Sequence, residues 1–241
     1  MAAGQIERWR IINASSARYV RLSIGGRPFT ILGTDGGLID APVTVTEVLL
    51  TPADRVDIAV GPFTEGETIA VDALKYNRMT VARAKNEPFA TVRVGPPAPS
   101  RAVIPTTLRS IEPLVSGPVS PTREVHLGFK PSLRHGVTFV VNKEPHHRDT
   151  PVKVGELQVW DVINDTMMDH PFHLHGFFFQ VVEVNGEPPA FRSWEDTINV
   201  PPKGRVRIAW VADDRPGEWM YHCHILEHHE QGMMGHFAVV R

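Results

Sequence analysis

The first part of the chain is a series of short segments in which apolar and polar residues alternate. In residues 55–60, for example, Val56 and Ile58 would share one face of an extended strand, with a polar residue between them. Pairs of turn residues such as Gly25-Gly26 separate these segments. The pattern predicts β-strands at residues 7–12, 19–24, 29–32, 43–50, 55–60, 68–73 and 89–94.

The second part of the chain shows the same strand pattern after a stretch rich in proline. Prolines recur across residues 95–121, which is typical of a linker between domains. We therefore expect one domain at residues 1–95, a linker at 96–122 and a second domain at 123–241. In the second domain, strands are predicted at residues 124–128, 138–142, 157–164, 177–184, 196–200, 205–210 and 220–224.

The density of the predicted strands indicates an all-β protein. Short strands at near-regular spacing are typical of a β-sandwich or a Greek-key barrel. No window shows sustained helical periodicity, although residues 113–120 can hold a turn of helix. The two halves therefore look like two all-β domains, without visible repetition of sequence between them.

Composition excludes several classes of function. The chain has 241 residues, of which 42% are hydrophobic, enough to bury the cores of two domains. A formal net charge of −2 argues against nucleic-acid binding, which needs a basic surface. No apolar run is long enough to span a membrane. The first ten residues contain no apolar signal core, so either the protein stays inside the cell or a leader is missing from this sequence.

The single cysteine lies in the most informative motif, His222-Cys223-His224. One cysteine cannot form an intrachain disulfide, and a lone thiol is either a small buried side chain or a ligand. Successive side chains of a strand point to opposite faces, so the two histidines share one face and the thiol points to the other. The motif therefore predicts two metal sites back to back, joined through one residue.

Two segments together supply a candidate copper–thiolate site. His228 and Met233 follow Cys223 by five and ten residues, so a loop can fold them back to the thiol's side. In the segment HPFHLH, His170 lies three residues before His173 and therefore on the opposite face. Thiolate, imidazole and a weak thioether are the ligands of blue-copper electron-transfer centres. The predicted ligands of this site are His170, Cys223, His228 and Met233.

The other four histidines of these segments form a second candidate group. His173 and His175 share one face of the first segment, and His222 and His224 share one face of the second. An all-imidazole group suits copper and would also accept zinc. A lone histidine is more often an ordinary surface or core residue. Two His-x-His units that match strand alternation, one built around the only cysteine, favour metal binding instead.

These motifs carry a resemblance to a known family. The segments HPFHLHGFFFQVV and GEWMYHCHILEHHEQGMM closely resemble the C-terminal copper motifs of multicopper oxidases of the bacterial laccase and cuprous oxidase type. RWRIINASS and WEDTINVPPKG resemble parts of the same family's second and third cupredoxin domains. The resemblance covers essentially the whole chain. It implies two cupredoxin-like Greek-key domains, of which only the second holds copper ligands.

The resemblance also implies a role for each candidate ligand. The four residues of the thiolate site would bind the mononuclear type 1 copper, where a substrate is oxidised one electron at a time. His173 would bind the type 2 copper of a trinuclear cluster that reduces dioxygen to water. The ligands of the binuclear type 3 pair in that cluster would be His175, His222 and His224. Because Cys223 sits between two cluster histidines, an electron can pass through its backbone without leaving the chain.

Three further expectations concern electrons and protons. Met233 as the axial ligand predicts a modest type 1 potential, because a coordinating thioether helps to stabilise the oxidised ion. His228 is expected to present a ring edge towards solvent and to be the electron entry point. Many bacterial relatives have an acidic residue directly after this histidine. Here that position is His229, so Glu230 or His229 is the candidate for proton delivery.

The sequence departs from the family pattern in one major respect. A trinuclear cluster in this family uses four His-x-His units, two from the first cupredoxin domain and two from the last. This sequence has only the last two, and no histidine precedes His126. It therefore resembles the second and third domains of an oxidase whose cluster is completed by an absent first domain or by another chain.

Two other functions stay open. The chain can be an electron-transfer or binding module that uses the type 1 copper alone, or an inactive fragment. A two-domain nitrite reductase is disfavoured, because such enzymes lack the His-Cys-His motif. The reductant is not determined by the sequence and can be a phenol, an aromatic amine or a metal ion. By resemblance, the intact protein would be periplasmic or extracellular.

Overall fold

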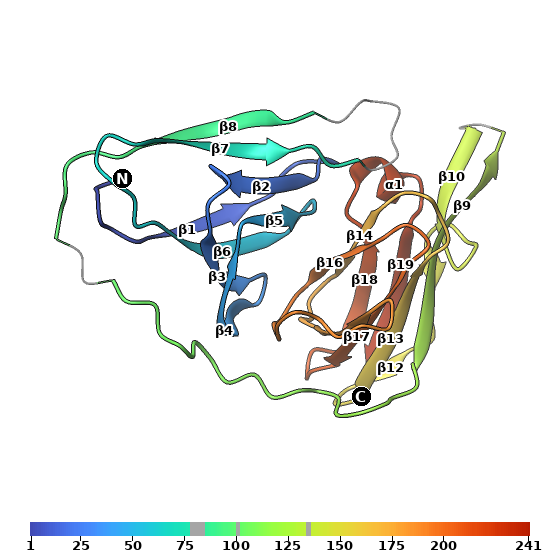
Figure 1. The fold of residues 1–241 in the computed structure, drawn as a ribbon. Helices are drawn as coiled ribbons and strands as arrows, with labels where there is room; N and C mark the ends of the chain where they lie inside the picture. Colours follow the sequence, from blue (N-terminus) through green and yellow to red (C-terminus); the bar gives the residue numbers. More distant parts are fainter. Residues whose placement is uncertain (78–84, 100–101, 134–135) are drawn as a thin grey trace. The chain divides into compact units, whose positions relative to one another are not determined.

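Two compact units make up the chain, Met1–Ile111 and Glu112–Arg241 (Figure 1). The division between them falls inside the stretch at residues 96–122 that was expected to be a linker. Strands make up nearly all of the regular structure, which confirms the all-β prediction. No helix in the described part of the chain is long and apolar enough to cross a membrane. The computed structural model describes residues 1–77, 85–99, 102–133 and 136–241.

Two four-stranded sheets form the N-terminal unit. The first has the order β1-β6-β3-β4, with bounds Glu7–Ile12, Arg55–Val60, Phe29–Thr34 and Gly37–Val45. The second has the order β5-β2-β7-β8, with bounds Glu47–Leu50, Val20–Ile24, Thr68–Leu74 and Glu87–Arg93. The alternation seen in the sequence appears in β6, where Val56 and Ile58 are buried.

The predicted strand at residues 43–50 is two strands in the structure. β4 continues to Val45, and β5 begins at Glu47 in the other sheet. The chain changes sheets at Thr46, which is a bend rather than a glycine or a proline. The sequence hides this corner because a strand can pass from one sheet to the next through a bend without any loop.

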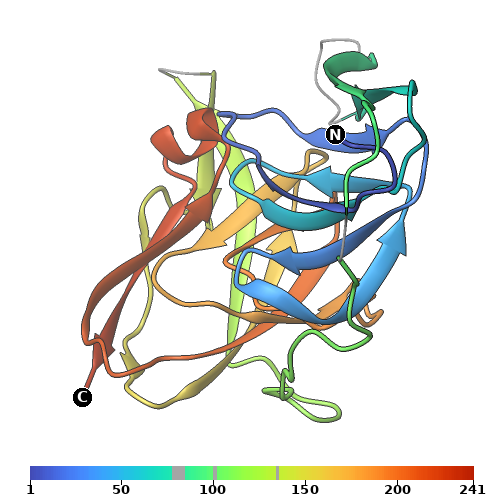
Figure 2. The same ribbon diagram turned by 90° about the vertical axis from the view of Figure 1, so that its left-hand side faces the viewer.

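A five-stranded and a six-stranded sheet form the C-terminal unit (Figures 1 and 2). The five-stranded sheet has the order β10-β9-β13-β17-β15, with bounds Gly136–Val141, Arg123–Ser132, Leu157–Asn164, Arg205–Val211 and Gln180–Val184. The six-stranded sheet has the order β11-β19-β18-β14-β16, with β12 also paired to β19. Its bounds, for β11, β12, β14, β16, β18 and β19, are His147–Arg148, Val152–Lys153, His170–Leu174, Thr197–Val200, Gly217–Cys223 and Met234–Val240.

Aromatic side chains fill the core of the C-terminal unit. The ring of Trp160 on β13 meets the rings of Trp210, Tyr221 and Phe237 edge-on, with centroids 5.2 to 5.6 Å apart. All four side chains are buried, and edge-to-face contacts of this kind add to the stabilisation from burial. Tyr221 belongs to β18 and lies two residues before Cys223. Strand β18 therefore contributes one side chain to the aromatic core and another to the candidate metal site.

Several elements of the C-terminal unit differ from the sequence predictions. β18 ends at Cys223, so His224 lies just past the strand that was predicted at residues 220–224. A short helix, α1 (Leu226–Glu230), occupies part of the expected loop, and β19 was not predicted. Residues 113–120 contain no helical turn. A helix of five residues is too short to leave a periodic pattern in the sequence.

Candidate metal centre

Strands β14 and β18 lie side by side and bring the two histidine motifs together. In their antiparallel register, Phe172 lies opposite Cys223 and His173 lies opposite His222. Residues opposite each other point to the same face, and neighbours along a strand point to opposite faces. Cys223 therefore shares a face with Phe172 and, two residues earlier, His170. His173 and His222 share the other face, as the alternation in the sequence predicts.

Three of the four residues predicted for the thiolate site converge in the interior. The Sγ atom of Cys223 lies 3.5 Å from Nδ1 of His170 and 3.4 Å from Nδ1 of His228. The two Nδ1 atoms are 3.1 Å apart. All three side chains are buried. One sulfur and two imidazole nitrogens that meet away from water fit a copper ion, because a thiolate is a soft ligand.

Backbone hydrogen bonds after α1 bring Met233 next to this group. The amide N–H of Cys223 donates to the carbonyl of Met233 at 3.1 Å, and the amide N–H of Met233 donates to the carbonyl of His228 at 3.0 Å. Met233 is fully buried, whereas its neighbour Met234 is partly exposed. Helix α1 therefore brings the chain back to Cys223. The sequence predicted only a loop in this place.

The ring of Phe139 on β10 covers His228. The two rings are stacked, with centroids 3.9 Å apart and an interplanar angle of 23°. His228 is only 4% exposed. The expectation that it presents a ring edge towards solvent is therefore wrong. The covering residue comes from the other sheet of the unit, so its contact depends on tertiary packing and leaves no local mark in the sequence.

The second group of histidines assembles on the opposite face of the same two strands. Rings in contact have centroids 4.8 to 5.6 Å apart. The shortest approach joins Nε2 of His175 to Nε2 of His222, at 2.9 Å. The members of this group are His173, His175, His222 and His224. Several imidazole nitrogens gathered in this way can bind metal ions.

Hydrogen bonds orient two of these rings. Nδ1 of His173 lies 2.9 Å from the carbonyl oxygen of Asp196 and 3.0 Å from the hydroxyl of Thr197. Nδ1 of His222 lies 2.9 Å from the carbonyl oxygen of Cys223. A ring nitrogen that donates to a carbonyl carries the proton, so the Nε2 atoms of His173 and His222 keep a lone pair that could bind a metal ion. These orienting partners are backbone or hydroxyl groups that sequence motifs did not predict.

Burial shifts the pKa of His175, His222 and His224 in the second group. It is the largest cause that lowers the pKa of His175 and His224, and the largest of several causes that together lower the pKa of His222 to about 3. Nearby histidines contribute to the same lowering, because a second positive charge in the group is unfavourable. The neutral imidazole, which is the form that binds metals, is therefore favoured in the folded chain.

We expect the metal-free chain to lose stability as the pH falls from about 6.5 towards 3. In this window the unfolded chain binds a proton at His222 that the folded chain does not bind, so acid favours unfolding. This residue contributes roughly a few kcal/mol to the loss. Urea unfolding at a series of pH values, with a chelator present, measures the effect. His222→Gln should flatten the pH dependence of stability, whereas the control His146→Asn, at an exposed position, should keep it. Identical curves for the wild type and His222→Gln would contradict the lowered pKa of His222.

Glu230 and His229 lie at the edge of the imidazole group. The ring of His229 has its centroid 5.0 Å from that of His222. Nε2 of His229 lies 3.7 Å from a carboxylate oxygen of Glu230, whose side chain is 67% exposed. A line of titratable groups therefore runs from the surface to His222.

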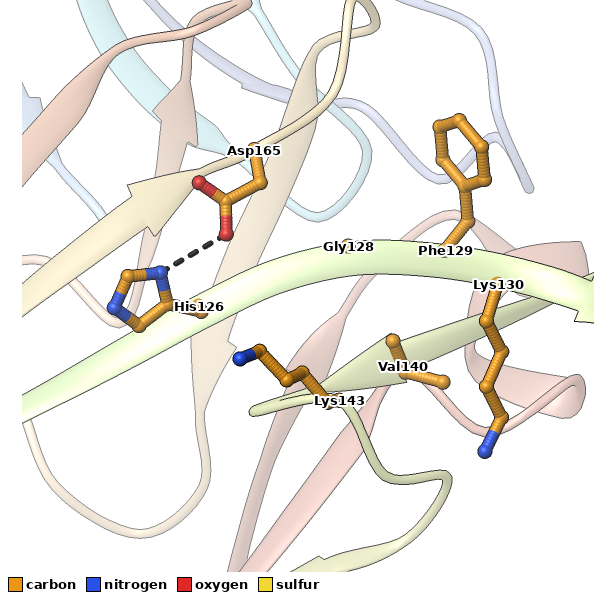
Figure 3. Close-up of a pocket in the computed structure, with 7 residues that line it drawn as sticks. All are labelled: His126, Gly128, Phe129, Lys130, Val140, Lys143 and Asp165. Atoms are coloured by element: carbon orange, nitrogen blue, oxygen red, sulfur yellow. Dashed lines mark hydrogen bonds and ion pairs between the residues drawn. The ribbon is translucent and has the colours of Figure 1, made fainter.

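A separate pocket opens on the five-stranded sheet (Figure 3). Its volume is about 390 Å³, and its lining includes Lys130 and Lys143. His126 and Asp165 point towards each other across one side, with Nδ1 and a carboxylate oxygen 2.9 Å apart. None of the predicted copper ligands is among the lining residues of this pocket. The pocket is therefore distinct from the metal centre.

Similarity to known proteins covers both units. Residues 119–241 match a family model described as multicopper oxidase, and residues 1–68 match a second model with the same description. The laccase of Bacillus subtilis is 31% identical in an alignment that covers 94% of this chain and 49% of that protein. The chain spans about half the length of the curated relatives it matches.

Solved structures agree with this similarity. A multicopper oxidase from Campylobacter jejuni, described as a metallo-oxidase, is 32% identical with a TM-score of 0.83, over 96% of this chain and 53% of that one. The McoA multicopper oxidase from Aquifex aeolicus is 30% identical with a TM-score of 0.88, over 100% of this chain and 56% of that one. The expected cupredoxin-like all-β fold is thereby confirmed. The chain belongs to the multicopper oxidase family.

Proposed function

We propose that this chain forms the electron-accepting part of a laccase-like oxidase, with a type 1 copper held by His170, Cys223, His228 and Met233. The observation that supports this most strongly is the meeting of the Cys223 sulfur with two histidine Nδ1 atoms, within 3.5 Å and out of contact with water. A copper ion at such a site accepts electrons one at a time from a reductant.

Each residue of this site has its own task. Cys223 provides the thiolate, and the neutral rings of His170 and His228 provide Nδ1 atoms. Met233 would provide a thioether, a weak ligand that would keep the potential of a bound copper ion modest. His228 is the electron entry point, and because Phe139 stacks on its ring, a reductant approaches across that phenyl ring. Burial keeps water from the thiolate and sets the polarity around it.

The opposite face supplies part of the trinuclear cluster. His173 is the type 2 ligand, and the type 3 ligands are His175, His222 and His224. The hydrogen bond from Nδ1 of His222 to the carbonyl of Cys223 holds that ring with Nε2 towards the group. Peptide bonds join Cys223 to both neighbouring histidines, so the route between the two sites stays within the chain.

Protons needed to reduce dioxygen to water enter at Glu230. Its exposed carboxylate can exchange protons with solvent, and His229 lies between it and His222. An imidazole can accept a proton on one nitrogen and release one from the other near neutral pH. This pair takes the place of the acidic residue found directly after the type 1 histidine in many bacterial relatives.

The remaining cluster ligands come from a further domain or from another chain. Support for this part of the proposal is that the family uses four His-x-His units, and that the relatives are about twice as long as the matched region. The reductant is a phenol, an aromatic amine or a metal ion, and dioxygen is the final acceptor. A periplasmic or extracellular location belongs to the same proposal.

The proposal predicts that the purified chain binds about one copper ion tightly and turns blue, yet consumes little dioxygen by itself. Bound copper, the visible spectrum and oxygen uptake with a phenolic reductant measure these three properties. A colourless copper-loaded chain would remove the type 1 assignment. Sustained oxygen uptake by the chain alone would show that no further ligands are needed. A blue chain that exchanges electrons but stays inactive when a relative's first domain is added would favour an electron-transfer module.

A further inference from the structure

His170 is held at both nitrogens of its ring. Nδ1 faces Cys223, with its sulfur 3.5 Å away, and Nε2 lies 2.8 Å from the hydroxyl oxygen of Thr166. Both His170 and Thr166 are buried. The contact with Thr166 therefore acts on the histidine from the side opposite the proposed metal.

The hydroxyl proton of Thr166 has acceptors other than His170. The hydroxyl oxygen lies 2.8 Å from Oδ1 of Asn164 and 3.1 Å from the carbonyl oxygen of Met168. The amide N–H of Met168 donates to the same hydroxyl at 3.1 Å. These two carbonyl oxygens can only accept hydrogen bonds. At such short distances the hydroxyl must therefore donate its single proton to one of them. A lone pair of the hydroxyl oxygen is then left facing Nε2 of His170.

Asn164 fixes this arrangement. Its Nδ2 donates to carbonyl oxygens of Met168, Val200 and Pro201, at 2.7 to 3.0 Å. These three acceptors determine which end of the amide is Nδ2, so Oδ1 must face Thr166. There Oδ1 accepts the backbone N–H of Thr166 as well as its hydroxyl. Asn164 is 1% exposed, and water does not replace these bonds.

We propose that Thr166, oriented by Asn164, is a positioning residue that keeps the proton of His170 on Nε2 and so presents Nδ1 to the metal. A lone pair on the hydroxyl oxygen favours the ring tautomer with a proton on the facing nitrogen. Ligand histidines generally donate their second N–H to such a partner, which fixes the ring and makes the other nitrogen a better ligand. The tautomer of His170 is a property of the metal-free chain and can be measured there. The expected gain in copper affinity, by contrast, rests on the proposed function.

Nitrogen-15 chemical shifts of His170 in the metal-free wild-type chain test the tautomer directly. We expect the shift pattern of a ring protonated at Nε2, and a mixture of tautomers in Thr166→Val. Thr166→Ser, which keeps the hydroxyl, should retain the wild-type pattern. A wild-type ring protonated at Nδ1 would overturn the proposal without any variant.

Copper affinity tests the consequence. In competition with a chelator, Thr166→Val should bind copper about 10–100-fold more weakly, and Thr166→Ser should stay close to wild type. Thr51→Val, which removes another buried threonine hydroxyl in the N-terminal unit, should leave affinity unchanged. Equal affinity and equal spectra for all variants, with a blue wild type, would overturn the positioning role and leave the proposed function standing. A colourless wild type would defeat the proposed function, while the nitrogen shifts still decide the tautomer.

Discussion

Cys223→Ser is expected to stay colourless after copper loading and to bind copper more than about a hundredfold more weakly than the wild-type chain. The intense colour of a blue-copper centre comes from charge transfer between the thiolate and the oxidised ion, and serine provides no thiolate. A serine hydroxyl is also a hard ligand that stays protonated near neutral pH. Loss of an outer partner already costs about 10–100-fold in affinity, so loss of a direct ligand costs more. The visible spectrum and chelator competition measure both effects.

Met234→Leu is the matched control for this substitution. It removes the sulfur atom of the residue next to Met233 in the chain, but Met234 is partly exposed, whereas Met233 is buried and bonded through its backbone to Cys223. The control should remain blue with unchanged affinity. A blue Cys223→Ser chain, or a colourless Met234→Leu chain, would mean that the sulfur ligands have been assigned wrongly.

Gly235→Ala is expected to destabilise the C-terminal unit by about 3 kcal/mol or more. Gly235 on β19 lies opposite Tyr221 on β18, and the tyrosine ring crosses directly over it. A Cβ at this glycine would lie 2.7 Å from Cε1 of Tyr221 and would overlap its Cζ and hydroxyl oxygen. The ring cannot move aside easily, because it is fully buried against Trp160 and donates a hydrogen bond to Asp149. Urea unfolding of the metal-free chain measures the change.

Gly128→Ala is the matched control in the same unit. A Cβ at Gly128 on β9 would meet Cγ2 of Val140 at 3.7 Å, which is an ordinary contact. Alanine also reduces the entropy of the unfolded chain, so this variant should be neutral or more stable by up to about 1 kcal/mol. Similar losses in both variants would show that the overlap with Tyr221 is not the cause.

The sequence predicted which side chains lie on which face of the two strands, because the relevant geometry is local. Alternation along a strand already separates Cys223 from His222 and His224, and the register of β14 with β18 keeps that separation. The predicted positions of most strands were also close, since apolar alternation and turn residues are local properties. The same reasoning located His170 on the face of the thiol.

The sequence did not predict contacts between distant segments, or the bends that bring near neighbours together or move a strand into another sheet. Phe139 covers His228 from another sheet, and the hydroxyl of Thr166 meets His170 only after the chain between them turns. The change of sheet at Thr46 was missed because β-forming residues continue through the bend. Such contacts are set by the three-dimensional fold, and neither periodicity nor motif spacing records them.

The closed stretch from Cys223 to Met233 has a consequence for how this protein can change during evolution. Three of the four proposed type 1 ligands lie within it, and the hydrogen bond from the Cys223 amide to the Met233 carbonyl ties its ends together. An insertion or deletion inside this stretch would displace several ligands at once, whereas one at the exposed turn around Gly186 would leave them all in place. Length variation among descendants of this sequence should therefore accumulate outside the stretch, which would be inherited or exchanged between genes as a single piece.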